Sequence, residues 1–222
     1  MNNFKGIKKN SNKINYYNMS IEEISKIEGK KSILIHACCA PCVCWPLEFL
    51  NEKFEITVMY NNSNIYPETE YIIRRDEAVK YVEIFNKAHN ANVKIIVTDY
   101  KGLEYINKLS ILKDEPEGGK RCLFCYSTRM AEAYDYAEKN NFDYFTTVMT
   151  ISRQKDSQIL NQIGKSLEIH HPKTKYLYSD FKKKQGMDKA VKIQKECNMY
   201  RQQYCGCIYS YQEYLIKKSK QQ

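Results

Sequence analysis

The sequence predicts an α/β protein built on a mostly parallel, Rossmann-like sheet. Apolar runs of strand length alternate with longer segments of helical pattern, as expected when helices connect parallel strands. The chain has 222 residues, 43% of them hydrophobic, which is enough to bury one substantial core. It contains no run of 18 apolar residues, so no membrane-spanning helix is predicted.

The first predicted elements follow from a helix cap and two apolar runs. Ser20 followed by Glu23 is typical of a capping box and predicts a short helix that ends before Gly29. Residues 32–36 and 54–60 are apolar runs typical of buried strands, and residues 43–53 between them suit a helix. The chain therefore begins its sheet with a strand–helix–strand unit.

The pattern continues through the middle of the chain. Pro67 predicts the start of a long helix, because proline is favoured in the first turn. Apolar residues recur along one side of this helix at Tyr71, Ala78, Val82 and Phe85. Residues 93–98 and 144–148 are predicted strands, and residues 129–140 are a predicted helix. No linker clearly divides the chain.

The predicted organisation is a leader followed by one domain. Residues 1–30 combine a flexible, Asn- and Lys-rich leader with the short helix, and they lack the apolar segment of a secretory signal. Residues 31–222 form a single α/β domain, in which residues 165–222 are a basic, cysteine-containing extension. Without a signal we expect a cytoplasmic protein, in which nine cysteines are metal ligands or redox groups.

The positive charge of the chain is concentrated in this extension. The formal net charge is +9, and residues 165–222 hold thirteen Lys or Arg against five Asp or Glu, which gives +8. Seven tyrosines lie in the same segment. Such a segment is either a solvated basic surface or a surface that binds RNA phosphates by charge and RNA bases by stacking.

The cysteines mark the candidate site. Cys38, Cys39, Cys42 and Cys44 fall at the end of the first predicted strand, where open α/β sheets bind their ligands. The glycine-rich loop that would bind a phosphate at this position is absent. The first turn therefore favours metal or redox chemistry.

Three interpretations of the thiols remain open on spacing alone. Cys39 and Cys42 before a helix are typical of a dithiol oxidoreductase, whose thiolate the helix stabilises. Together with Cys122 and Cys125 they could form a four-cysteine zinc site, and a non-catalytic zinc protein that binds RNA is one alternative. The same thiolates could instead hold an iron–sulfur cluster.

Five motifs occur in an order that resembles one enzyme family. They are H-A-C-C-A-P-C, Y-P-E-x-E-Y-x-x-R, E-P-E-G-G-x-R-C-x-x-C, D-F-K-K and Y-R-Q-x-Y-C-G-C-x-Y-S. From about residue 31 to about residue 214 the chain resembles the QueH-type epoxyqueuosine reductases. This resemblance implies an adenine-nucleotide-hydrolase-like fold and a 4Fe–4S cluster. It also implies the last step of queuosine synthesis, in which epoxyqueuosine at the wobble position of tRNA loses its epoxide oxygen as water.

The resemblance also implies roles for individual cysteines. The cluster ligands would be Cys38, Cys39, Cys122 and Cys125. Cys205 and Cys207 would be a redox-active pair, with a role as reduced metal ligands as the alternative. Cys42 could bind a second, mononuclear metal (iron or zinc). The reaction would require an external electron donor and a tRNA carrying epoxyqueuosine in its anticodon stem-loop.

Further residues are weaker candidates. Asp180 is a candidate proton donor, and His36 is expected in the core. Cys44 and Cys197 match no motif cysteine and are expected to be small buried side chains. Candidate contacts to RNA, each with a structural role as its alternative, are Arg121, Arg129, Lys182, Lys183, Arg201, Tyr200 and Tyr204.

Overall fold

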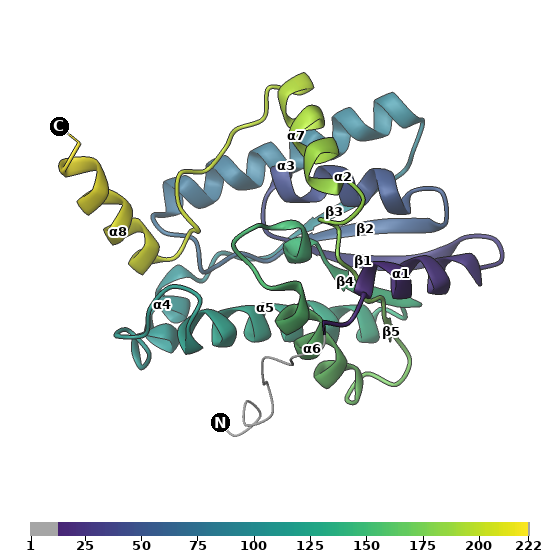
Figure 1. Ribbon diagram of the computed structural model, residues 1–222, viewed down its shortest axis with the longest axis horizontal. Coiled ribbons are helices and arrows are strands. Elements are labelled where there is room, and N and C mark those ends of the chain that lie inside the picture. The colour runs from purple at the N-terminus through teal and green to yellow at the C-terminus, as the bar shows by residue number, and fades with distance from the viewer. Residues whose placement is uncertain (1–12, 222) are drawn as a thin grey trace.

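A computed structural model describes residues 13–221 and has the predicted α/β architecture (Figure 1). The sheet formed by these residues has five parallel strands in the order β3-β2-β1-β4-β5. The parallel, Rossmann-like sheet is therefore confirmed, whereas residues 1–12 of the expected leader lie outside the described part of the chain. The strands are β1 (Lys31–Ala37), β2 (Phe54–Tyr60), β3 (Lys94–Val97), β4 (Tyr144–Thr147) and β5 (Lys175–Tyr176).

Helices cover both faces of this sheet. Because successive side chains of a strand point to opposite faces, β1 buries Ile33 and Ile35 in one apolar cluster and Leu34 in the other. The cluster of Ile33 packs against α2 (Ala40–Leu50), α3 (Glu68–His89) and α7 (Gly186–Glu196). The cluster of Leu34 packs against α5 (Lys120–Lys139) and α6 (Ser157–Glu168).

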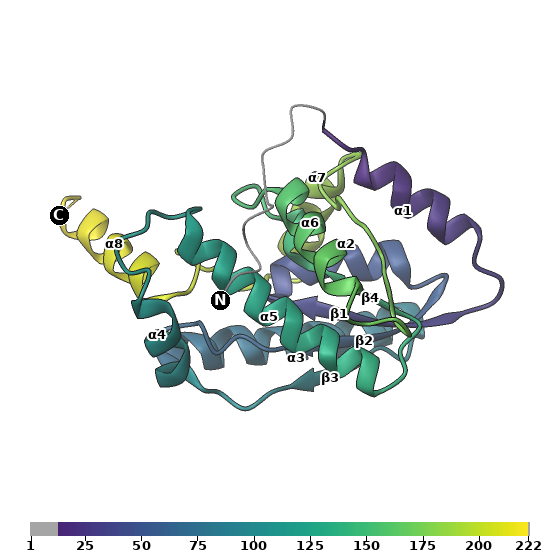
Figure 2. The same ribbon diagram turned by 90° about the horizontal axis from the view of Figure 1, so that it is seen from below.

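The remaining elements frame the carboxyl ends of the strands or extend away from the sheet. A 3-10 turn, η1 (Val148–Ile151), follows β4 directly, and α1 (Tyr16–Ser25) packs through Tyr16 on Tyr178. Helices α4 (Gly102–Ser110) and α8 (Ile208–Ser219) lie toward one end of the molecule in both views (Figures 1 and 2). No helix in the described residues is both long and apolar enough to cross a bilayer.

Three predicted helix boundaries were wrong. Helix α1 begins after Asn15, whose side chain accepts a hydrogen bond from the Asn18 amide, and Ser20 lies inside the helix with its hydroxyl bonded to the Tyr17 carbonyl. Helix α2 begins directly after Cys39. Helix α5 begins after Gly119, nine residues before the predicted start at residue 129, so Cys122 and Cys125 lie in its first two turns.

Candidate metal and redox site

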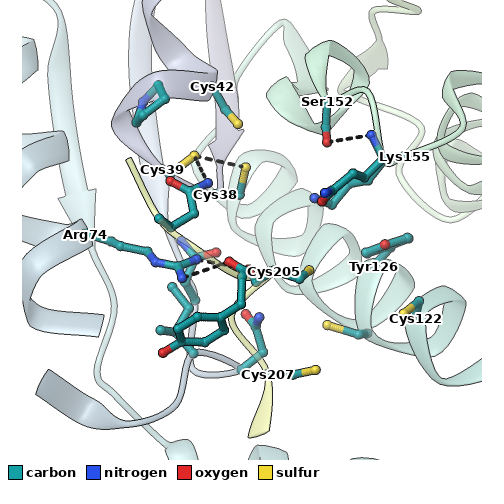
Figure 3. A pocket seen from close by; sticks show the side chains of 18 of the residues that line it. Cys38, Cys39, Cys42, Arg74, Cys122, Tyr126, Ser152, Lys155, Cys205 and Cys207 are labelled. Carbon is teal, nitrogen blue, oxygen red and sulfur yellow. Dashed lines mark hydrogen bonds between the residues drawn. The ribbon is translucent and has the colours of Figure 1, made fainter. Parts of the chain in front are cut away.

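One cavity of about 240 Å³ lies at the carboxyl ends of the strands and gathers most of the thiols (Figure 3). The segments after β1 and β4 both line it, which is where an open α/β sheet binds its ligand because the connections from these two neighbouring strands leave in opposite directions. Seven of the nine cysteines line the cavity, and they are Cys38, Cys39, Cys42, Cys122, Cys125, Cys205 and Cys207.

Three of these thiols form a group after β1. The sulfur atoms of Cys38, Cys39 and Cys42 all lie within 4.8 Å of one another. Hydrogen bonds from Cys39 and Cys42 lower the pKa of Cys38, and donating to Cys38 raises the pKa of Cys39 to about 12. Gln202 donates a hydrogen bond to the Cys39 sulfur at 3.4 Å. The group therefore favours one thiolate shared among three sulfurs, which is a soft ligand set for a metal.

Two more thiols face the cavity from the start of α5. The backbone amide of Gly118 donates to the Cys122 sulfur at 3.2 Å, and burial raises the pKa of Cys125 to about 11. Gly118 has φ +81°, a conformation that residues with side chains rarely adopt, so this glycine of the E-P-E-G-G motif permits the turn that brings its amide to Cys122. Glu115 accepts a hydrogen bond from the Lys120 amide and helps to close the turn.

The segment with Cys205 and Cys207 lies between α7 and α8, and α3 holds it in place. Arg74 is 2% exposed, and its two terminal nitrogens donate to the carbonyl oxygens of Cys205 at 3.0 Å and Tyr204 at 3.1 Å. Its Nε donates to Glu70 at 2.7 Å. Since no regular element contains this segment, the buried guanidinium supplies the hydrogen bonds that a helix or strand would supply.

Gly206, between the two cysteines, completes this attachment. Its carbonyl oxygen accepts from the Tyr66 amide at 2.7 Å, and its own amide donates to the Ser210 hydroxyl at 3.1 Å. Gly206 has φ +137°, and a Cβ there would lie 3.2 Å from Nη1 of Arg74. The C-G-C sequence therefore needs glycine both for its backbone angle and for the approach of Arg74.

Two arginines predicted to contact RNA are buried beside the thiols. Arg129 is 3% exposed and donates to Asn62 at 2.8 Å and to the sulfur of Met149 at 3.4 Å. Arg121 is 4% exposed, donates to the carbonyl oxygens of Lys113 and Glu115, and stacks 4.3 Å from the Tyr209 ring. Their positions give no support to phosphate contacts, because both side chains are buried and donate to protein groups.

The lysines of the D-F-K-K motif differ from each other. Lys182 points its ammonium inward and donates to the carbonyl oxygens of Thr150, Ser152 and Lys155. Lys183 is exposed and remains a candidate for phosphate contact. Asp180, the candidate proton donor, is 6% exposed, accepts from the Ser157 hydroxyl at 3.0 Å and does not line the cavity.

The other candidates are also placed. Tyr200 donates to Glu70 and Tyr204 donates to the Tyr66 carbonyl, so both rings support the C-G-C segment, whereas Arg201 is exposed at the cavity. His36 is fully buried, and burial together with the charge of Arg129 lowers its pKa to about 3. Cys44 is fully buried, as expected, and Cys197 is partly buried.

Sequence analysis missed Lys155, a cavity residue in the loop after η1. Its side chain is partly buried, and its ammonium lies 5.8 Å from the centre of the Tyr126 ring. Burial alone would lower its pKa, but the negative charge available at Cys205 and Cys38 outweighs burial and raises it. The loop R-Q-K-D around it matches no motif, and only its place in the connection that follows β4 could have identified it.

Comparison with known proteins places this site in a family. The family model described as epoxyqueuosine reductase QueH matches residues 33–213. The epoxyqueuosine reductase QueH of Streptococcus pyogenes is 40% identical over 202 residues, which cover 89% of this chain and 78% of that protein. The QueH of Staphylococcus aureus is 36% identical over 208 residues, which cover 91% of this chain and 86% of that protein.

A solved structure shares the fold. The U34-tRNA thiolase NcsA of Methanococcus maripaludis, solved with its 4Fe–4S cluster, aligns with a TM-score of 0.50 and 16% identity, covering 91% of this chain and 72% of that one. At this identity the likeness shows the fold alone. The matches in sequence extend over nearly the whole described chain and include every segment that lines the thiol cavity. This chain is a member of the QueH family of epoxyqueuosine reductases, and so of the oxidoreductases.

Proposed function

We propose that this protein is a cytoplasmic iron–sulfur enzyme that reduces epoxyqueuosine at the wobble position of tRNA. The observation that carries the proposal is the convergence of seven thiols on one cavity at the carboxyl ends of the sheet. The reaction consumes two electrons and two protons, and it converts the epoxide to an alkene and water. An external one-electron donor supplies the electrons.

The residues around the cavity fit an iron–sulfur cluster. Thiolates are the ligands that such clusters require, and buried cations such as Arg129 offset their negative charge. We assign Cys38, Cys39, Cys122 and Cys125 as the ligands of a 4Fe–4S cluster, which supplies one-electron transfer when bound. Cys42 lies in the same sulfur group as Cys38 and Cys39 and could bind a second, mononuclear iron or zinc ion.

The remaining candidate residues serve the substrate and the redox change. In the proposal, Cys205 and Cys207 cycle between dithiol and disulfide, and the hydrogen bonds from Arg74 fix the backbone of Cys205 while they do so. Exposed basic residues such as Lys183 and Arg201 bind the phosphates of the anticodon stem-loop. The partly buried tyrosines support the thiol segment.

The first test is the metal content of protein purified without oxygen. We expect iron with acid-labile sulfide, and reduction of epoxyqueuosine in an anticodon stem-loop. Cys122→Ala and Cys125→Ala should each lose the cluster and the activity, because each removes a thiolate ligand. Cys197→Ala is the matched control, since Cys197 is partly buried away from the cavity.

Other outcomes would support the alternatives. Stoichiometric zinc without sulfide would support a four-cysteine zinc protein that binds RNA. Metal-free protein that exchanges disulfides through Cys39 and Cys42 would support a dithiol oxidoreductase. Full iron, sulfide and turnover in both alanine variants would refute the assignment of Cys122 and Cys125.

A further inference from the structure

Removal of an epoxide oxygen requires a proton donor at that oxygen. When a carbon–oxygen bond of the epoxide breaks, negative charge develops on oxygen, and a positioned acid accelerates the step. Asp180 does not line the cavity, and its carboxylate is bonded to Ser157 and lies 3.6 Å from Lys182. The thiols in the cavity are assigned to metal binding and redox exchange. A different group must therefore serve the oxygen.

Most cations around the cavity have protein partners. Arg74 is bonded to Glu70 and two carbonyl oxygens, Arg121 to carbonyl oxygens, and Arg129 to Asn62. Arg201 is exposed. Arginine also keeps its proton in proteins, whereas lysine can transfer one to an oxygen on which negative charge develops. These four guanidinium groups can stabilise charge, but none is suited to give a proton to the substrate.

Lys155 differs from these arginines. It lines the cavity, and within residues 13–221 its ammonium has neither a hydrogen-bond acceptor nor a carboxylate in ion-pair contact. Its three N–H donors are therefore available to a ligand. The ring of Tyr126, 5.8 Å away, offers weak attraction that does not consume a donor.

The loop that carries Lys155 is held by a second lysine. The Lys182 ammonium donates to the carbonyl oxygens of Thr150, Ser152 and Lys155 at 2.9, 3.4 and 3.2 Å. The backbone amide of Lys155 also donates to the Ser152 carbonyl at 3.3 Å. The inward-pointing lysine of the D-F-K-K motif thus fixes the backbone from which Lys155 extends.

From this arrangement we propose that Lys155 binds the epoxide oxygen of the substrate and protonates it as the carbon–oxygen bond breaks. The inference rests on the proposed function. The Nζ–H proton passes to the oxygen, two electrons from the external donor replace the two carbon–oxygen bonds with a carbon–carbon double bond, and a second proton from solvent completes water. Lys182 is a positioning residue for this step.

Binding measurements test the contact without any redox chemistry. Protein free of metal would be titrated with two stem-loops, one with epoxyqueuosine and one with queuosine, which lacks the oxygen. A hydrogen bond from a charged donor predicts about tenfold or stronger preference for the epoxide in the wild type. We expect Lys155→Gln to lose this preference and Lys155→Arg, which keeps charge and donors, to retain most of it. Equal preference in the wild type and Lys155→Gln would overturn the proposal.

Single-turnover rates then distinguish proton transfer by Lys155 from an effect of its positive charge alone. With the cluster reconstituted and dithionite as reductant, Lys155→Gln and Lys155→Arg should both lose roughly a hundredfold or more in single-turnover rate, as expected for loss of a general acid. Lys182→Met should lower the rate by less, without changing iron or sulfide. The matched control is Arg153→Gln, which removes an exposed cation from the same loop.

Each failure has its own signature. If the wild type does not reduce epoxyqueuosine, the proposed function is wrong. If the wild type is active and Lys155→Arg has the same single-turnover rate and iron content as the wild type, Lys155 only balances the charge of the thiolates. That outcome refutes the proton-donor proposal.

Discussion

Arg74 offers a direct test of how the C-G-C segment is held. Arg74→Gln removes a guanidinium that is 2% exposed, leaves the carbonyls of Tyr204 and Cys205 without their donors, and leaves Glu70 with Tyr200 as its hydrogen-bond partner. Glu70 is itself only 11% exposed, so the change leaves a buried carboxylate without its cationic partner. We therefore expect both a less stable fold and a looser thiol segment.

The expected loss of stability is large for a single substitution. Breaking a buried ion pair by removing one partner costs about 3–5 kcal/mol. The lower end applies here, because Tyr200 still donates to Glu70 and because water can reach the carbonyls once the segment opens. We expect about 3 kcal/mol less free energy of unfolding in urea for the metal-free, reduced protein. Alkylation of Cys205 and Cys207, followed by mass spectrometry, should accelerate well below the unfolding transition.

The neighbouring arginine is the control. Arg75 on the same helix pairs with Asp76 at 2.7 Å, but this pair is exposed, and such pairs contribute about 0.2–1 kcal/mol. Arg75→Gln should leave both stability and thiol reactivity nearly unchanged. The reasoning is refuted if Arg74→Gln behaves like Arg75→Gln. A loss of stability with unchanged alkylation would show that Arg74 supports α3 and not the thiol segment.

Three further predictions concern redox exchange, RNA and pH. Cys205→Ser should keep iron, sulfide and stem-loop binding but fail in multiple turnover, and turnover at the wild-type rate would contradict a redox pair. Replacing exposed Lys183 and Lys184 with Gln should weaken stem-loop binding and lower the slope of log affinity against log salt by about one to two units. The same replacement of Lys30 and Lys94, at the amino ends of β1 and β3, should leave binding unchanged. Burial would raise the pKa of Glu23, but hydrogen bonds from Lys175 and Tyr144 outweigh it and lower the pKa below 4.5, so Glu23 stabilises the fold above that pH. The stability difference between wild type and Glu23→Gln should therefore shrink as pH falls through the lowered pKa.

The sequence predicts the sheet better than it predicts the helices that carry the site. The runs at β1, β2 and β4 are apolar and strand-length, and each was predicted to within one residue at either end. Strand β5 has two residues and leaves no period to detect. The start of α5 was missed because C-L-F-C-Y-S-T contains cysteine, aromatic and hydroxyl residues of modest helix propensity.

That missed helix start explains why the burial of the two arginines was not predicted. In a helix, Arg121, Cys125 and Arg129 follow one another at intervals of four residues and share a face. Had the helix been extended back to residue 120, this spacing would have predicted both guanidinium groups beside the thiols. The convergence of Cys38 and Cys39 with Cys122 and Cys125 was predictable, because it depends on the carboxyl ends of parallel strands. The placement of Lys155 was not predictable, because it depends on hydrogen bonds from Lys182 that leave no pattern in the sequence.

The motifs are explained by the contacts they make with one another. Glu70 and Arg74 of one motif bond to Tyr200, Tyr204 and Cys205 of another. Arg121 bonds to the carbonyls of Lys113 and Glu115, just before and at the start of its own motif, and Lys182 bonds to the loop after η1. These charged residues therefore hold the thiol segments and the loop of Lys155 in place, and most of their donors are used in doing so. In the proposed enzyme, the charge that meets the substrate comes from residues without such partners. These are Lys155, whose neighbours match no motif, the exposed Arg201 in the cavity and the exposed Lys183 outside it.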